Sequence, residues 1–278
     1  MADLVSMDAD VSAPDDLGSG GSRSAPVDRA LDGPVAVLTM QQAPHNFLGI
    51  ELLDAVLAGL NWAVERQARA VVLRSGLRHF CAGADVGLFE SANRGVKPDV
   101  DLTEALRVFD ELPIPILASV HGVCVGGGFE LALACDLIVA SESAKIGSVE
   151  ATIGVNPLMG AMQRVTQRAG ATRAKEMALL ARRYDARTLE RWNIINRVVP
   201  DDQLADVTGT LAQELAHGPT IAHASSKAII SYATAHGVRA TDAAMADLQT
   251  GIWSSNDLKE GLAALAANGP GAARFEGR

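Results

Sequence analysis

Short runs rich in β-branched residues alternate with longer amphipathic stretches along most of this chain, and this alternation limits the possible folds more than any other feature. In residues 51–65 the apolar side chains recur about every 3.6 residues, which predicts a helix with one buried face. Similar stretches predict helices at residues 103–112, 129–135, 161–169 and 173–181. Strands are predicted at residues 35–40, 70–74, 114–120, 137–140 and 197–199. Strands that alternate with helices predict an α/β fold.

Two of the predicted strands are followed at once by a second extended piece, at residues 80–81 and 144–146. This arrangement favours a coiled stack of ββα units over a doubly wound sheet. From Asp201 onward the pattern is almost entirely helical, with candidate helices at residues 204–217, 220–235, 241–251 and 257–267. We therefore predict a core over residues 31–203 and a helical C-terminal region over residues 204–278, which must pack on that core or on a neighbouring subunit.

The first 30 residues differ from the rest in composition. They carry six Asp against two Arg, together with a Gly/Ser-rich stretch and few apolar residues. Such a segment cannot bury enough apolar surface to offset the entropy of ordering, so residues 1–30 are predicted to be a disordered acidic tail. It has neither the basic start nor the apolar stretch of a signal peptide, which predicts a cytoplasmic protein.

Charge and cysteine content narrow the function classes. The formal net charge is −9 and no Lys/Arg cluster stands out, which argues against nucleic acid as a partner. No apolar run approaches the roughly 20 residues that cross a bilayer, so no membrane partner is predicted. The three cysteines, without CxxC spacing, fit buried thiols better than disulfides or zinc ligands, and no metal site is predicted.

A stretch of small residues, Phe80-Cys81-Ala82-Gly83-Ala84-Asp85, lies between a short strand and a candidate helix at residues 86–91. Small side chains let a ligand approach the backbone, so an N–H group such as that of Ala84 can be exposed to it. The same pattern also fits a tight strand-to-helix turn that Asp85 caps. This segment alone leaves both interpretations open.

Three consecutive glycines, residues 126–128, begin the helix that follows strand 114–120. They do not form a P-loop, because no Gly-Lys-Ser/Thr follows, nor a dinucleotide fingerprint, because Leu131 occupies its third glycine position. Glycines at a helix start leave unpaired N–H donors in the positive field of the helix dipole. Such donors suit an oxyanion.

Glu130 lies in the first turn of that helix, and Glu150 follows a short strand. Each has an ordinary explanation, since a Glu is favoured in a first turn by capping and dipole effects and a Glu in a loop is usually solvated. As a pair, two carboxyls in different protonation states can serve as general acid and general base.

Taken together, these segments resemble the enoyl-CoA hydratase/isomerase (crotonase) superfamily over nearly the whole chain after residue 34. The stretches 80–85 and 126–132, with Cys135-Asp136, look like the two oxyanion segments of that family. The other matching pieces are Gln163-Arg164, Asn196-Arg197-Val198-Val199-Pro200, residues 255–261 and Phe275-Glu276-Gly277-Arg278. Each piece is a weak signal alone, but all occur in order and at family-like spacing.

The resemblance implies a crotonase-like spiral of ββα units, a helical C-terminal region that forms homotrimers or hexamers, and an acyl-CoA thioester substrate held between the glycine-rich segments. Coenzyme A is then part of the substrate, and no separate cofactor is expected. The implied oxyanion donors are the backbone N–H groups of Ala84 and Gly127. The implied catalytic residues are Glu130 and Glu150, and the implied substrate-binding positions are Ala82, Gly83, Asp85 and Gly126.

The predicted function is addition of water across the double bond of a trans-2-enoyl-CoA, giving a 3-hydroxyacyl-CoA through an enolate that the oxyanion donors stabilise. Glu130 is assigned to the attacking water and Glu150 to proton delivery at C2. Two alternatives stay open: isomerisation of a 3-enoyl-CoA to a 2-enoyl-CoA, and non-catalytic binding of an acyl-CoA.

Three departures from the family pattern leave the substrate open. Residues 157–162 carry larger side chains than the glycine-rich run of many hydratases, which should narrow or reshape the acyl pocket. Val149 replaces the usual proline before the second glutamate, and residues 41–46 lack the basic residue often found near the CoA phosphates.

Overall fold

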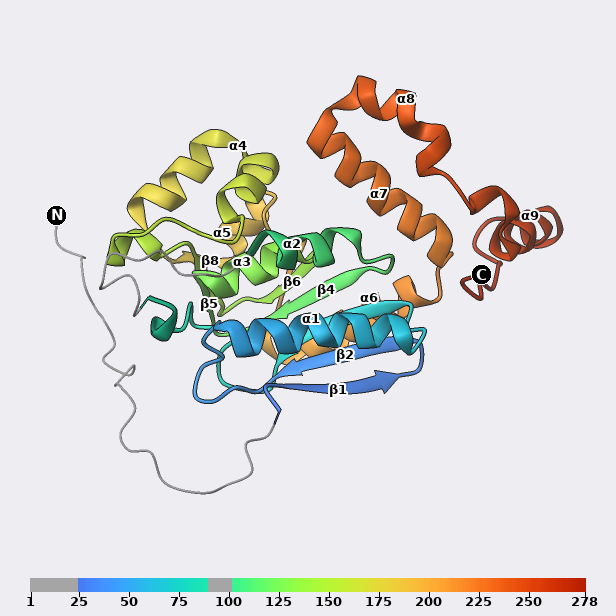
Figure 1. Ribbon diagram of the computed structural model, residues 1–278. Helices are drawn as coiled ribbons and strands as arrows, with labels where there is room; N and C mark the ends of the chain where they lie inside the picture. Colours follow the sequence, from blue (N-terminus) through green and yellow to red (C-terminus); the bar gives the residue numbers. More distant parts are fainter. Residues whose placement is uncertain (1–24, 90–101) are drawn as a thin grey trace.

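The computed structural model describes residues 25–89 and 102–278, and in it a six-stranded and a three-stranded sheet follow the spiral path expected of ββα units (Figure 1). The larger sheet has the order β1 (Val27–Asp32), β2 (Val35–Met40), β3 (Ala70–Ser75), β4 (Ile116–Val120), β6 (Leu137–Ser141) and β9 (Arg197–Val199). The smaller sheet consists of β5 (Val123–Val125), β7 (Lys145–Gly147) and β8 (Tyr184–Asp185). The chain passes from the larger to the smaller sheet at β4–β5 and again at β6–β7, which confirms the predicted fold class.

Helices fill the connections and the C-terminal part. They are α1 (Ile50–Glu65), α2 (Leu102–Glu111), α3 (Gly127–Ala134), α4 (Ala161–Leu180), α5 (Ala186–Arg191), α6 (Leu204–Ala216), α7 (Thr220–His236), α8 (Val238–Leu248) and α9 (Asn256–Asn268). Short 3₁₀ turns are η1 (Val86–Phe89), η3 (Glu150–Ile153), η4 (Asp201–Gln203) and η5 (Ile252–Ser254). The α4 segment joins two predicted helices across a kink at Gly170, whose backbone is not helical (φ 80°, ψ 162°). None of the helices in the described part of the chain is both long enough and apolar enough to cross a bilayer.

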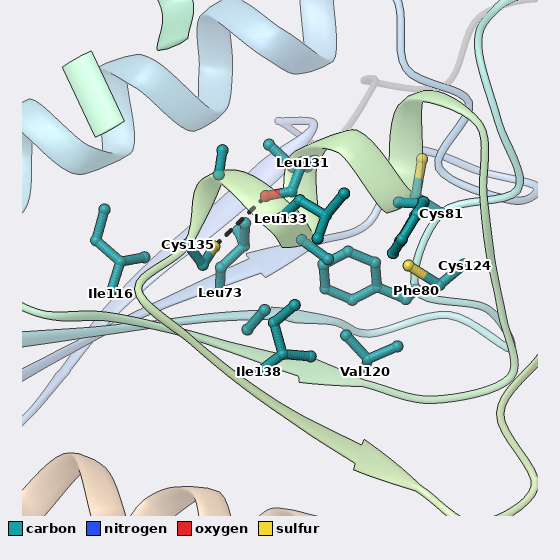
Figure 2. Close-up of a cluster of buried hydrophobic side chains, with 14 of the residues drawn as sticks. Leu73, Phe80, Cys81, Ile116, Val120, Cys124, Leu131, Leu133, Cys135 and Ile138 are labelled. Atoms are coloured by element: carbon teal, nitrogen blue, oxygen red, sulfur yellow. Dashed lines mark hydrogen bonds between the residues drawn. The ribbon is translucent and has the colours of Figure 1, made fainter. Parts of the chain in front are cut away.

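Successive side chains of a strand point to opposite faces of the sheet, and strands β2, β3, β4 and β6 bury side chains on both faces. In β2, Leu38 and Met40 join the main core, whereas Val35 packs on the other face with residues of α6. The main core lies between the sheet and the helices α1 and α3. Figure 2 shows Leu131 and Leu133 of α3 in this core, close to Phe80 and to side chains of β3, β4 and β6. These contacts hold α3, and with it Glu130, against the sheet.

The first described element corrects the predicted boundary of the acidic tail. Residues 27–32 form β1, which pairs antiparallel with β2 through a turn at Gly33 (φ +57°). The last residues of the segment predicted to be disordered are therefore ordered, because the Asp32-Gly33 turn returns the chain onto β2. Residues 1–24 lie outside the described residues, and the prediction for them stays a prediction.

The C-terminal region has two parts. Helix α6 packs on the larger sheet, where Thr208 lies 3.2 Å from Ser119 of β4, oxygen to oxygen. Helices α7 to α9 extend away from the sheets (Figure 1). The end of the chain returns to the start of α9, where the Asp257 carboxylate, 4% exposed, accepts hydrogen bonds from the backbone N–H groups of Glu276 and Gly277. Arg69 ties the same end to the core through the carbonyl of Phe275.

Candidate active site

Strand pairing in the smaller sheet brings the two predicted catalytic glutamates together. Strands β5 and β7 run parallel, and the Gly126 N–H donates to the Gly147 carbonyl at 3.0 Å. Helix α3 begins directly after β5, and η3 begins shortly after β7. Because parallel strands end at the same edge of a sheet, Glu130 in the first turn of α3 and Glu150 at the start of η3 lie at one site.

The first glycine-rich segment is held between two other segments. The backbone of Cys81 forms an isolated parallel β-bridge with that of Cys124, and the backbone of Ala84 forms one with that of Leu48. The bonds of the second bridge run from Leu48 N–H to the Gly83 carbonyl (2.8 Å) and from Asp85 N–H to the Leu48 carbonyl (2.9 Å). This pattern turns the N–H group of Ala84 away from Leu48.

The N–H groups of Ala84 and Gly127 have no hydrogen-bond acceptor among the described residues. Gly127 is the first residue of α3, and N–H groups of a first helical turn have no partner within the helix. Among the described residues, the two predicted oxyanion donors are thus uncommitted, as a site that receives a carbonyl oxygen requires.

Glycine is needed where these segments touch. A Cβ atom on Gly126, where φ is +55°, would lie 3.5 Å from the Gly83 Cα. A Cβ atom on Gly128 would lie 2.4 Å from the carbonyl oxygen of Cys81, which is closer than real Cβ atoms come. The glycines therefore allow the two oxyanion segments to pack backbone against backbone.

Glu130 is 4% exposed, and its carboxylate is held by the backbone of the segment before α4. Its Oε1 atom accepts hydrogen bonds from the N–H groups of Met159 (2.6 Å) and Ala161 (3.3 Å). Burial raises the pKa of Glu130 to about 7, the hydrogen bond from Met159 opposes this rise, and the negative charge of Glu150 adds to it. A carboxyl with a pKa near neutrality is suited to take and give protons at neutral pH.

Glu150 presents its carboxylate to the second oxyanion segment. A Cβ atom on Gly126 would lie 3.9 Å from Oε1 of Glu150. Both carboxylate oxygens are buried and accept no hydrogen bond from any described residue. A buried carboxylate without protein donors is unfavourable for folding alone, so its presence next to Glu130 marks a functional site.

The four predicted substrate-binding residues lie in or beside the two oxyanion segments, and each makes different contacts. Ala82 donates its N–H to the His45 carbonyl at 3.1 Å, and Gly83 and Gly126 form the contact between the segments. Asp85 caps the turn that begins η1, since its Oδ1 accepts the N–H of Gly87 at 2.8 Å. The capping interpretation of Asp85 therefore holds, and its contact with a CoA substrate stays a prediction.

The cysteines are free, buried thiols, as expected from their spacing. Cys81 lies within the first oxyanion segment, Cys124 lies in β5 before the second, and Cys135 follows the last residue of α3 (Figure 2). Burial raises the pKa of Cys81 to about 12. A thiol in that state carries almost no thiolate at neutral pH, which argues against a nucleophilic role.

Two sets of residues that support the site are not apparent from the sequence. The first is the pair of N–H donors at Met159 and Ala161 that orient Glu130. The second is Asn46, fully buried with φ +52°, whose Nδ2 donates to Ser75 Oγ (2.8 Å) and to the Phe80 carbonyl (3.1 Å). Backbone donors leave no residue-type signal, and a lone Asn after Pro44 is typical of an ordinary turn.

Replacing Glu130 with Gln is expected to stabilise the fold at alkaline pH while abolishing acid–base function. The pKa of Glu130 in the folded protein, about 7, lies above its ordinary value of 4.5. Charging Glu130 therefore costs folding free energy that is absent below pH 4.5 and fully present above pH 7. The amide avoids this cost and still offers an oxygen to Met159. Urea unfolding should show that Glu130→Gln gains about 1–3 kcal/mol in the free energy of unfolding at pH 8 and nothing at pH 4. An equal gain at pH 8 and pH 4 would contradict this prediction.

Comparison with known proteins agrees with this geometry. The family model described as enoyl-CoA hydratase/isomerase matches residues 31–271. A carnitinyl-CoA dehydratase from Salmonella paratyphi A is 35% identical over 208 residues, which covers 71% of this chain and 77% of that protein. The carnitinyl-CoA dehydratase from Salmonella enteritidis is 33% identical over 205 residues, with the same coverage of 71% and 77%.

Solved structures show the same fold. An enoyl-CoA hydratase structure from Geobacillus kaustophilus matches with a TM-score of 0.83 and 29% identity, covering 92% of this chain and 100% of that chain. An enoyl-CoA hydratase from Bacillus anthracis matches with a TM-score of 0.82 and 26% identity, covering 91% and 100%. With the family model spanning both oxyanion segments and both glutamates, the chain belongs to the enoyl-CoA hydratase/isomerase family.

Proposed function

We propose that this protein catalyses the reversible addition of water to the double bond of a trans-2-enoyl-CoA. One observation carries the proposal: the carboxyls of Glu130 and Glu150 interact at the start of α3 and η3, beside glycine-rich segments whose Ala84 and Gly127 N–H groups have no acceptor among the described residues. The crotonase-type fold of the relatives and the acyl-CoA thioesters on which the family acts support the same reaction class.

The oxyanion donors supply the electrostatic part of the mechanism. As water adds at C3, negative charge builds on the thioester oxygen, and the N–H groups of Ala84 and Gly127 donate hydrogen bonds to it. Loss of one such donor typically costs about 10²–10³ in rate. Because these donors belong to the backbone, their position depends on how the two glycine-rich segments pack, and no reorganisation is needed during the reaction.

The glutamates supply the proton transfers. Glu130, whose Oε1 is held by Met159 and Ala161, directs Oε2 to the attacking water and takes its proton. Glu150, in its protonated form, delivers a proton to C2, which completes the 3-hydroxyacyl-CoA. The proton that Glu130 took from water then exchanges through solvent to the ionised Glu150, which restores the starting states. The reverse reaction uses the same groups in opposite roles, so dehydration of a 3-hydroxyacyl-CoA is equally within reach of this site.

Carnitinyl-CoA dehydration is a second candidate, favoured by the relatives of that name at 33–35% identity. It is the same water elimination on a 3-hydroxyacyl-CoA whose acyl group carries a quaternary ammonium. Isomerisation of a 3-enoyl-CoA is a third, which needs only one carboxyl to move a proton; the presence of two buried carboxyls favours hydration over it.

A panel of substrates tests these alternatives directly. The purified protein is incubated with short, medium, long and aromatic trans-2-enoyl-CoAs, with crotonobetainyl-CoA and with 3-enoyl-CoAs. Loss of the conjugated thioester absorbance reports hydration, and its appearance from a 3-enoyl-CoA reports isomerisation. We expect hydration of at least one 2-enoyl-CoA to be faster than any isomerisation. Tight binding of every thioester with turnover of none would contradict the proposal and support a binding protein.

We also propose that the chain forms homotrimers or hexamers through its C-terminal helices. Helices α7 to α9 carry large apolar side chains that are mostly exposed in the single chain, among them Ile230 (65%), Val238 (72%) and Leu262 (59%). Trp253 in η5 is 76% exposed. Burial of such a surface in a neighbouring subunit would be favourable. Light scattering during size-exclusion chromatography measures the mass, and a monomer at micromolar concentration would contradict the proposal.

A further inference from the structure

A histidine side chain completes the contact between the two oxyanion segments. Residues 80–81 pair with residues 121–125 through three backbone hydrogen bonds, from Phe80 N–H to the His121 carbonyl (3.0 Å), from Cys81 N–H to the Val123 carbonyl (3.2 Å) and from Val125 N–H to the Cys81 carbonyl (3.2 Å). The two segments run in the same direction, one toward Ala84 and the other toward Gly127. Their pairing therefore sets how far apart the two oxyanion donors lie.

The next bond of a regular parallel ladder would run from the Val123 N–H to the His79 carbonyl. That carbonyl instead accepts the hydroxyl of Ser75 at 2.6 Å. The Val123 N–H donates to the His79 imidazole, with 3.2 Å between N and Nδ1. The side chain of His79 thus replaces its own carbonyl in the ladder.

The sequence accommodates this replacement at Gly122. A Cβ atom there would lie 2.8 Å from Nδ1 of His79 and 2.5 Å from the Arg78 carbonyl oxygen, and φ of Gly122 is +60°. Only glycine allows the segment to approach the imidazole so closely. The contact between His79 and Val123 therefore depends on having glycine at position 122.

We propose that His79 is a positioning residue: its neutral imidazole, accepting the Val123 N–H at Nδ1, holds the Ala84 and Gly127 donors in register, and its protonation releases them. The inference rests on the proposed function, since it concerns the oxyanion donors of that reaction. His79 touches no reacting atom and acts through the backbone of the two segments.

The surroundings of His79 favour the neutral form. Burial lowers its pKa, the nearby side chains of His45, Arg78 and His121 lower it further, and a hydrogen bond with the Arg78 backbone opposes them. The ring of His45, from the segment after β2, lies 5.4 Å away between centroids. His121, between β4 and β5, is placed by a 2.7 Å contact of its Nε2 with the Leu77 carbonyl. The groups that shift the pKa of His79 include no carboxylate.

Acid therefore works against the contact in two ways. A protonated His79 carries a hydrogen on Nδ1, so two N–H donors face each other across the ladder. It also places a positive charge next to Arg78 and two other histidines. The contact is complete at alkaline pH and is lost as the pH falls through the lowered pKa of His79.

Two substitutions separate hydrogen bonding from titration. In His79→Asn the amide oxygen can occupy the place of Nδ1 and cannot be protonated in this range, whereas in His79→Gln the amide lies one bond too far. The ratio of kcat for wild type to kcat for His79→Asn, measured across pH, cancels the titration of Glu130 that both share. We expect a ratio near one at about pH 8 that falls about tenfold by about pH 5.

His79→Gln is expected to lose about tenfold or more in kcat relative to His79→Asn at every pH, with little change in KM. It should also bind acetoacetyl-CoA, whose enolate absorbs strongly and mimics the oxyanion, about tenfold more weakly, while its affinity for free CoA is unchanged. His45→Gln, which leaves the ladder intact, should still lose kcat relative to His79→Asn in acid, with the loss moved to higher pH because His45 no longer lowers the pKa of His79. In the wild-type protein, nuclear magnetic resonance should show the Val123 amide shifting together with the titration of His79.

A ratio that is flat with pH, or a Val123 amide that ignores the titration of His79, would overturn the inference. So would a His79→Gln variant with full activity. Failure of the proposed function gives a different result, because Glu150→Gln would then hydrate enoyl-CoA as well as the wild type. If Glu150→Gln is inactive and the ratio is flat, only the role of His79 is refuted.

Discussion

Replacing Glu150 with Gln is expected to lower kcat for hydration of crotonyl-CoA by about 10²–10⁴, while the protein folds normally. The amide has the size of the carboxyl but can neither release nor take up a proton at C2. Both oxygens of Glu150 lack hydrogen bonds to described residues, so the substitution breaks no contact that supports the fold. KM should change little, because the oxyanion donors and the binding segments are untouched.

Glu130→Gln is expected to lose activity to a similar extent, because it removes the base at the attacking water. A matched control is Glu65→Gln at the exposed end of α1, which makes the same chemical change far from the site and should leave kcat unaltered. Stopped-flow or steady-state decay of the conjugated thioester absorbance measures all three variants. Normal hydration by both Glu130→Gln and Glu150→Gln would refute the assignment of the pair.

Gly128→Ala should destabilise the protein more than any other single methyl addition in α3. The added Cβ would lie 2.4 Å from the Cys81 carbonyl oxygen, 2.6 Å from its Cβ and 2.7 Å from its Sγ. These atoms belong to the first oxyanion segment, and the side chain of Cys81 is fully buried, so the segment must move as a whole. We expect a loss of about 3 kcal/mol or more in the free energy of unfolding, together with loss of activity, because the two segments can no longer pack.

Gly209→Ala in α6 provides the matched control. Apart from the neighbouring turns of its own helix, no atom of the described residues lies within 4 Å of the place of its Cβ, so alanine should stabilise the helix by about 0.5–1 kcal/mol through its higher helix propensity. Urea unfolding followed by circular dichroism compares the two variants with the wild type. If the Gly128→Ala protein were as stable as the wild type, the two oxyanion segments could not lie as close together as the 2.4 Å distance at Gly128 implies.

Elements with many local signals were predicted from the sequence, and elements that exist only by pairing were not. The apolar periodicity of residues 51–65 and the β-branched run of β2 led to correct elements with nearly correct ends. Strands β5 and β8 have three and two residues, which is too short for any periodicity to appear. They are strands only because β7 lies between them, and β1 was missed because its first residues share the acidic composition of the tail.

Part of the candidate site could also be predicted, because some of its residues are close together in the sequence. Glycines 126–128 and Glu130 lie within five residues, so exposed N–H donors and a nearby carboxyl could be recognised from the sequence alone. By contrast, Glu150 becomes half of a pair only when β7 docks beside β5. Burial, which raises the pKa of Glu130 to about 7, depends on the segment before α4 and the whole core around α3.

The amino-acid sequence by itself determined the residue types that the site needs: small residues where backbone meets backbone, and two carboxyls at the right places along the chain. Only the tertiary structure decided which groups face one another, namely Glu130 held by Met159 and Ala161, Glu150 turned toward Gly126, and the His79 ring inserted into the ladder. The physical reason is that these contacts join segments far apart in the sequence, and strand register and burial, which arise from the packed core, set their distances and their pKa values.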